Sequence, residues 1–165
     1  MADIDIKQIS EWFEAHSKAM VLFASQFVDR AEAEDVIQDV FIRMQSHANI
    51  PRDVKAWLYR SVKNAALNRI RSRDRRKVRE TTAHEESTTW FDARPEDVID
   101  AEQARQLLMN LDESEREIVV LKIWAGLTFE QIAGISERSR SSVFRIYEKS
   151  IRTMRQQLES PHERI

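Results

Sequence analysis

Apolar side chains recur every three or four positions over most of this chain, which is the spacing of amphipathic α-helices. Within residues 1–79 the pattern predicts a helix over 6–28, a second over about 32–46 and a third that begins near Val54. The third helix runs into an arginine-rich stretch, Arg69–Arg79. Because each helix has an apolar stripe to bury, we expect the three to pack together as one unit.

The same spacing returns after residue 100 and predicts a second, four-helix unit over 101–165. Capping side chains stand where three of its helices should begin: Asp112, Thr128 with a glutamine three residues later, and Ser139. Gly126 follows the second helix, where a left-handed residue commonly ends a helix. The predicted helices are Ala101–Leu111, Glu113–Trp124, Phe129–Gly134 and about 140–158.

Residues 80–100 separate the two units and show no apolar period. They contain Pro95, four threonines and several acidic side chains, a composition typical of mobile segments. We therefore expect an all-α protein with two small helical domains, 1–79 and 101–165, joined by a flexible acidic linker. Trp90-Phe91 interrupts the linker and is expected either to anchor it to a domain or to contact a partner.

Composition narrows the chemistry that these 165 residues can carry. Two glycines and no cysteine exclude a glycine-rich phosphate loop, a disulfide and a thiolate zinc site. The four histidines have no ligand spacing and no carboxylates are paired as in a hydrolase, so we expect no enzyme, no metal and no other cofactor. No apolar run is long enough to span a membrane and the N-terminus is acidic, so we expect a cytoplasmic protein without membrane insertion.

The formal net charge of −2 hides a strong segregation of charge along the chain. Residues 52–79 carry eleven Lys and Arg against two Asp, and residues 138–155 carry six against one Glu. Residues 80–118, in contrast, carry twelve Asp and Glu against three Arg, and residues 1–51 are also net acidic. Two separate basic segments indicate contact with a polyanion such as nucleic acid.

The last two predicted helices have the pattern of a helix-turn-helix. Ile132 and Ala133 would be buried in the short first helix and Ile135 in the turn, while the outer N-terminal face of the second helix would enter the major groove. Arginine there can bind guanine edges or phosphates, and Phe144 can contact a thymine methyl group or pack. The candidate DNA-binding residues are Arg138, Arg140, Ser141, Ser142, Phe144, Arg145 and Lys149.

Motifs in the first unit indicate a particular class of DNA-binding protein. Ala33–Met44 (AEDVIQDVFIRM), Ala56–Asn64 (AWLYRSVKN) and Arg69–Arg76 resemble successive parts of sigma region 2, and Leu111–Leu158 resembles sigma region 4. Over nearly its whole length, the chain is similar to a bacterial RNA polymerase sigma factor of the sigma-70 family, extracytoplasmic-function (group 4) type. It departs from that family in the turn of the helix-turn-helix, where Glu137 replaces a common glycine.

The resemblance implies a polymerase-binding surface on the second predicted helix. Asp35, Gln38, Asp39 and Ile42 share the face opposite its apolar stripe. In the family this face meets the clamp helices of the largest polymerase subunit, so the carboxylates would pair with basic partner residues. Complementary charge of this kind favours fast, selective docking.

The resemblance also implies contacts with the −10 promoter element. Lysine and arginine on the third helix would hold phosphates of the opening duplex. Asn49, in the loop before that helix, is the candidate for reading a flipped base. Trp57 and Tyr59 are candidates for stacking on separated bases, although a core role suits Trp57 equally well. The implied −10 residues are Asn49, Arg52, Arg60, Lys63, Asn64 and Arg71.

Three hypotheses about function follow. The leading one is a transcription initiation factor that binds core RNA polymerase, directs it to −10 and −35 elements and aids DNA melting. Its implied partners are the largest-subunit clamp helices, the flap of the second-largest subunit, promoter DNA and an anti-sigma factor. The alternatives are a stand-alone helix-turn-helix transcriptional repressor whose first unit dimerises, and a helical adaptor that reads no DNA. The asymmetric charge of the two units favours the first hypothesis.

Overall fold

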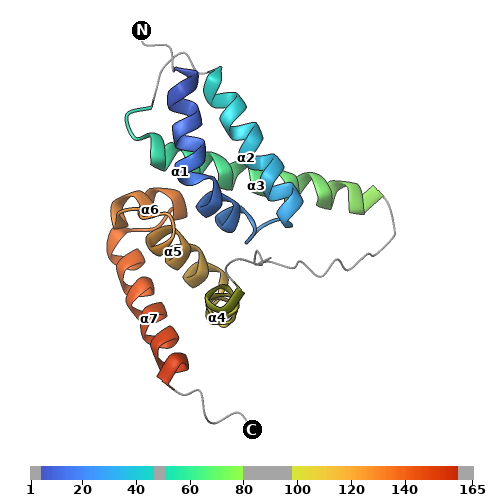
Figure 1. The fold of residues 1–165 in the computed structure, drawn as a ribbon. Helices are drawn as coiled ribbons and strands as arrows, with labels where there is room; N and C mark the ends of the chain where they lie inside the picture. Colours follow the sequence, from blue (N-terminus) through green and yellow to red (C-terminus); the bar gives the residue numbers. More distant parts are fainter. Residues whose placement is uncertain (1–4, 47–50, 80–97, 160–165) are drawn as a thin grey trace. The chain divides into compact units, whose positions relative to one another are not determined.

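The computed structural model describes residues 5–46, 51–79 and 98–159, and every regular element within these ranges is an α-helix. The chain divides into two compact units between Phe91 and Asp92 (Figure 1). The predicted all-α fold, with three helices followed by four, is confirmed, while Asn49 and most of the predicted linker lie outside the described residues. The helices are α1 Ile6–Ala24, α2 Arg30–Gln45, α3 Val54–Arg79, α4 Val98–Met109, α5 Glu113–Ile123, α6 Phe129–Ser136 and α7 Arg140–Glu159.

An aspartate caps the start of each helix in the first unit. The carboxylates of Asp5, Asp29 and Asp53 accept hydrogen bonds from backbone N–H groups two or three residues later, at 3.2, 2.8 and 3.1 Å respectively. Helix α1 ends at Ala24, four residues before the predicted end, because the Phe27 N–H donates to the Ala24 carbonyl and tightens the chain into a turn.

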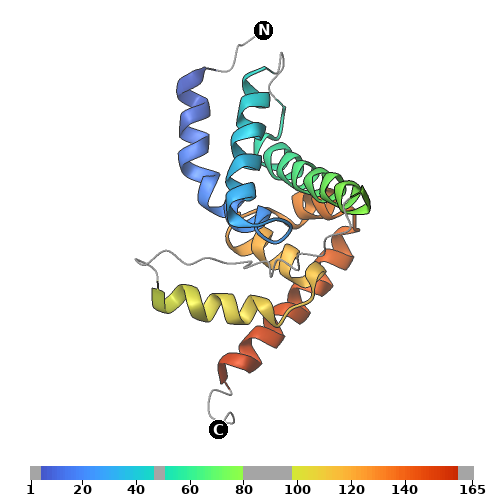
Figure 2. The same ribbon diagram turned by 90° about the vertical axis from the view of Figure 1, so that its right-hand side faces the viewer.

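Helices α1 and α2 lie side by side and α3 packs against both (Figures 1 and 2). Phe23 is fully buried at the centre, with its ring centroid 5.5 Å from Phe27 and 5.7 Å from Tyr59, both edge-on. Burying a side chain of this size contributes about 1.5–3 kcal/mol. The largest fully buried side chains of the unit are Met20, Phe23, Ile37, Met44, Leu58 and Tyr59.

The burial of Tyr59 corrects its predicted role in base stacking. Its ring is fully buried and packs against Phe23, so it has no face to offer a nucleic-acid base. Burial raises the pKa of the Tyr59 phenol. Within the described residues, its hydroxyl has no hydrogen-bond partner. The prediction was wrong because apolar contact with α1 takes the ring into the core.

Replacing Tyr59 by phenylalanine is expected to raise the free energy of unfolding by about 1 kcal/mol. The ring and its contacts remain, while a buried and unsatisfied hydroxyl is removed. Urea unfolding followed by circular dichroism measures the change. Tyr147→Phe, at a half-buried position in α7, is the control and is expected to change stability by less than about 0.5 kcal/mol. A clear loss of stability in Tyr59→Phe would contradict the account.

The second unit begins its helices with the predicted caps. Asp112 and Glu115 form a reciprocal capping box at α5, and Thr128 forms one with Gln131 at α6. Gly126 has the left-handed conformation predicted for it, with φ 66°. The largest fully buried side chains of this unit are apolar and come from α4, α5, α6 and the segment before α6: Leu108, Ile118, Leu121, Leu127 and Ile132.

Side chains from neighbouring helices join the elements of the second unit. The Arg116 guanidinium on α5 donates to the carbonyls of Leu108 and Leu111 at 3.1 and 3.0 Å, which satisfies backbone groups at the end of α4. Asn110 donates to Gln157 at 3.3 Å and so joins the α4–α5 connection to α7. Of the helices described, none combines the length and the apolar character that a membrane crossing requires.

Candidate protein-binding and nucleic-acid surfaces

The predicted polymerase-binding residues form one outer face of α2. Asp35, Gln38, Asp39 and Ile42 are all exposed, and the Ile42 side chain is 60% exposed despite being apolar. The opposite face of α2 is buried against α1 and α3. An exposed apolar side chain beside two carboxylates suits a protein partner that offers both basic and apolar groups.

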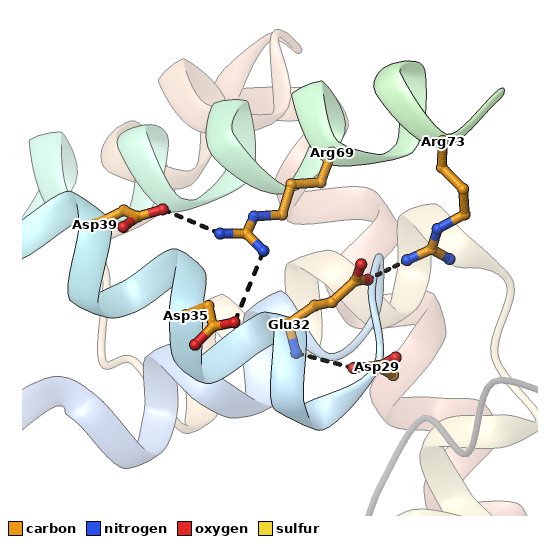
Figure 3. A network of polar contacts seen from close by, with 6 residues as sticks. All are labelled: Asp29, Glu32, Asp35, Asp39, Arg69 and Arg73. Carbon is orange, nitrogen blue, oxygen red and sulfur yellow. Dashed lines mark hydrogen bonds and ion pairs between the residues drawn. The ribbon is translucent and has the colours of Figure 1, made fainter. Parts of the chain in front are cut away.

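Two arginines of α3 reach the acidic face of α2 (Figure 3). Arg69 places Nη2 3.0 Å from the Asp39 Oδ2 and Nη1 4.0 Å from the Asp35 Oδ2. Arg73 forms an ion pair with Glu32. The sequence motifs did not reveal these pairs. The available signal was the four-residue spacing of the two arginines, which places them on one face of a helix.

The other side of α3 carries the predicted −10 residues. Arg60, Asn64 and Arg71 are exposed, and their spacing at 3.6 residues per turn places them opposite Arg69 and Arg73. The Arg71 guanidinium lies 3.5 Å from Asn68 on the same helix. Two further predicted residues flank this face: Lys63 is half-buried, and Arg52 is exposed just before α3. Helix α3 therefore has one cationic face toward α2 and another toward solvent.

Helices α6 and α7 have the form of a helix-turn-helix with a three-residue connection. Ile132, Ile135 and Val143 are buried between them and α5, although Ile135 belongs to the last turn of α6 rather than to the connection. The Ser139 hydroxyl accepts a hydrogen bond from the Ser142 N–H at 3.2 Å, as its predicted capping role requires.

The predicted −35 residues lie along the N-terminal half of α7 or just before it. Several of them also contact side chains of α5 or α6. Arg138 donates to the Ser114 hydroxyl at 2.8 Å, and the Arg140 Nε lies 3.9 Å from a Glu130 carboxylate oxygen. The Phe144 ring packs edge-on against Phe129, with centroids 5.3 Å apart. The remaining residues of this set are Ser141 and Arg145, both exposed, and Ser142 and Lys149.

Lys149 has a structural contact as well as a predicted DNA contact. Its Nζ lies 3.1 Å from Glu115 Oε1, while the other carboxylate oxygen of Glu115 caps α5. The hydrogen bond that Lys149 donates to Glu115, together with the negative charge of Glu115, raises the pKa of Lys149. Sequence reasoning did not identify this link, because Glu115 and Lys149 come from helices far apart in the chain.

Glu137 adopts the left-handed conformation that glycine favours, with φ 55° and ψ 41°. Replacing it by glycine is expected to raise the free energy of unfolding of the second unit by about 1 kcal/mol, because the side chain disfavours this conformation. The same substitution at exposed Glu148, within α7, is the control and should cost about 1 kcal/mol. Thermal unfolding measures the stability of both variants. Equal losses of stability in the two would show that the backbone at Glu137 is not strained.

Comparison with known proteins gives one family and one fold. Residues 12–76 match the sigma-70 region 2 family. The chain is 26% identical over 157 residues to the ECF RNA polymerase sigma factor SigL of Mycobacterium tuberculosis, with 88% of each chain covered.

Two solved structures have a similar fold. The sigma factor RpoE in complex with the anti-sigma factor NepR, from Bartonella quintana, has a TM-score of 0.71 at 19% identity, with 92% of this chain and 96% of that chain covered. CnrH in complex with the cytosolic domain of CnrY has a TM-score of 0.65 at 18% identity, with 96% and 92% covered.

The resemblance that the sequence motifs indicated is thereby confirmed: residues 12–76 match sigma-70 region 2, and the chain is similar to a sigma factor over most of its length. The relative SigL is of the extracytoplasmic-function type, the type that the motifs indicated for this chain.

Proposed function

We propose that the chain binds core RNA polymerase and directs it to promoters with specific −10 and −35 elements. The domain over 1–79 docks on polymerase, recognises the −10 element and helps to melt it, and the domain over 101–165 recognises the −35 element. Residues 80–100 link the two. The protein leaves after initiation and has no catalytic centre of its own.

The observation that carries this proposal is the separation of charge within the first unit. Asp35 and Asp39 lie on an acidic face of α2, whereas Arg60, Asn64 and Arg71 lie on the far side of α3. A basic protein surface and a nucleic acid can therefore bind this unit at the same time. A stand-alone repressor has no need of the exposed acidic face.

The partners of each surface follow from their chemistry and from the family. The acidic face of α2 pairs with the clamp helices of the largest polymerase subunit, and the second unit contacts the flap of the second-largest subunit. The basic face of α3 holds phosphates at the −10 element, with Asn49 reading a flipped base and the half-buried Trp57 stacking at its edge. An anti-sigma factor, like the one bound to RpoE of Bartonella quintana, covers these surfaces in the inactive state.

Footprinting on genomic promoter fragments, with and without core polymerase, tests the proposal. We expect the protein alone to protect no site strongly, and the protein with core polymerase to protect two regions of different sequence. Strong protection by the protein alone, with two-fold symmetry, would favour the repressor instead. Protection by polymerase that is the same with and without the protein would contradict any role in promoter choice.

A further inference from the structure

The proposed docking carboxylates are already paired with a cation of their own chain. Asp35 and Asp39 stand one turn apart on α2, and the planar Arg69 guanidinium bridges their Oδ2 atoms (Figure 3). Guanidinium is the group best matched to carboxylates, because its donors form a rigid fork. Arg69 thus occupies the position that a basic residue of a docking partner would take.

The contact is open enough to be displaced. The Asp35 and Asp39 side chains are 64% and 52% exposed, and that of Arg69 is 33% exposed. Solvent-exposed ion pairs contribute little to stability, because water screens the charges and ordering the side chains costs entropy. A cation that approaches either carboxylate is nevertheless repelled by Arg69 at close range.

Arg69 is also separate from the arginines assigned to DNA. It points toward α2, whereas Arg71, only two residues later, lies on the opposite face of α3. Arg75 is an exposed arginine of the same helix that is assigned to neither surface, and its Nε donates to the Arg71 carbonyl at 3.4 Å. It therefore provides a matched control for the loss of one positive charge.

We propose that Arg69 is an internal competitor for the docking surface: it holds Asp35 and Asp39 in the free protein and is displaced when a cationic partner binds. This proposal rests on the proposed docking of α2 to polymerase. Its consequence is that Arg69 lowers the affinity for polymerase. It also increases selectivity, because a partner must offer cations that replace the guanidinium at both carboxylates.

The test measures the affinity of the full chain for core RNA polymerase in the Arg69→Gln and Arg75→Gln variants. Arg69→Gln is expected to bind about three- to tenfold more tightly than the wild type, which is the size of change expected when one exposed ion-pair cluster no longer competes for the carboxylates. Arg75→Gln removes the same charge from an exposed position of the same helix and is expected to bind within about twofold of the wild type. In a background that carries both Asp35→Asn and Asp39→Asn, the gain in affinity from Arg69→Gln should disappear. The two carboxylates for which Arg69 and the polymerase compete are then absent.

The results distinguish the competitor role of Arg69 from the proposed docking of polymerase on α2. If the double Asn variant loses affinity while Arg69→Gln binds no more tightly than Arg75→Gln, the competitor role is overturned and docking through α2 stands. If the double Asn variant binds polymerase as well as the wild type, the docking assignment itself fails, and the competitor role fails with it.

Thermal unfolding checks that each variant is folded. Arg69→Lys provides a second variant if Arg69→Gln is unstable, since it keeps the charge but loses the two-pronged contact. It should bind polymerase more tightly than the wild type by a smaller factor. Weaker binding by folded Arg69→Lys would overturn the proposal.

Discussion

Replacing Phe23 by alanine is expected to lower the free energy of unfolding of the first unit by about 3–5 kcal/mol. Phe23 is fully buried and its ring meets Phe27 on one side and Tyr59 of α3 on the other. Truncation therefore removes apolar burial and leaves a cavity where α1 meets α3. Because small domains are stable by only about 5–15 kcal/mol, the variant should unfold at much lower urea concentration, as measured by circular dichroism.

Phe13 provides a matched control on the same helix. Its side chain is 39% exposed, and it packs on a single ring, that of Phe41, at 5.2 Å. Phe13→Ala should therefore cost about half as much as Phe23→Ala or less. Equal losses in the two variants would show that the Phe23 cluster is not the centre of the core.

Replacing Arg145 by alanine is expected to reduce transcription from a promoter with the cognate −35 element by about five- to a hundredfold. Arg145 is exposed on the N-terminal half of α7, the helix that a helix-turn-helix places in the major groove. A bidentate contact between arginine and guanine contributes about 1–3 kcal/mol of discrimination, and that energy sets the expected loss. Initial rates of transcription in vitro, with saturating core polymerase, measure the effect.

Arg155 controls for the loss of positive charge alone. Arg155 is exposed near the C-terminal end of the same helix, about ten residues after Arg145. Arg155→Ala should lower transcription by no more than about threefold, as expected for one phosphate contact at most. If Arg145→Ala left transcription unchanged, DNA recognition by α7 would be contradicted. The helical-adaptor hypothesis would then be favoured.

The helices, and the caps of α5, α6 and α7, could be predicted from the sequence because their causes are local. Apolar spacing marked every helix, and Asp112, Thr128 and Ser139 were identified as caps from residue type alone. The end of α1 was less accurate, because Phe27 follows Phe23 at helical spacing and extends the apolar pattern past the turn that begins at Ser25. A hydrophobic period does not reveal where hydrogen bonding changes from helix to turn.

The pairing of charges could not be predicted, because it depends on how helices meet in space. Arg69 and Asp39 are 30 positions apart in sequence, and of the two only Asp39 was assigned to a surface from the sequence. Lys149 and Glu115 belong to α7 and α5 and pair in the same way. The burial of Tyr59 likewise follows from the packing of α3 on α1, not from its own helix. The residues proposed for promoter contact stay predictions.

Transcription in vitro with core RNA polymerase, in the presence and absence of this protein, tests the central claim most directly. The template is a set of fragments from the source genome, and the products are mapped at their 5′ ends. The account predicts discrete transcripts that require the protein and whose start sites share −10 and −35 sequences. The same transcripts with core polymerase alone, or none despite binding of the protein to polymerase, would contradict its role as a promoter-specificity factor.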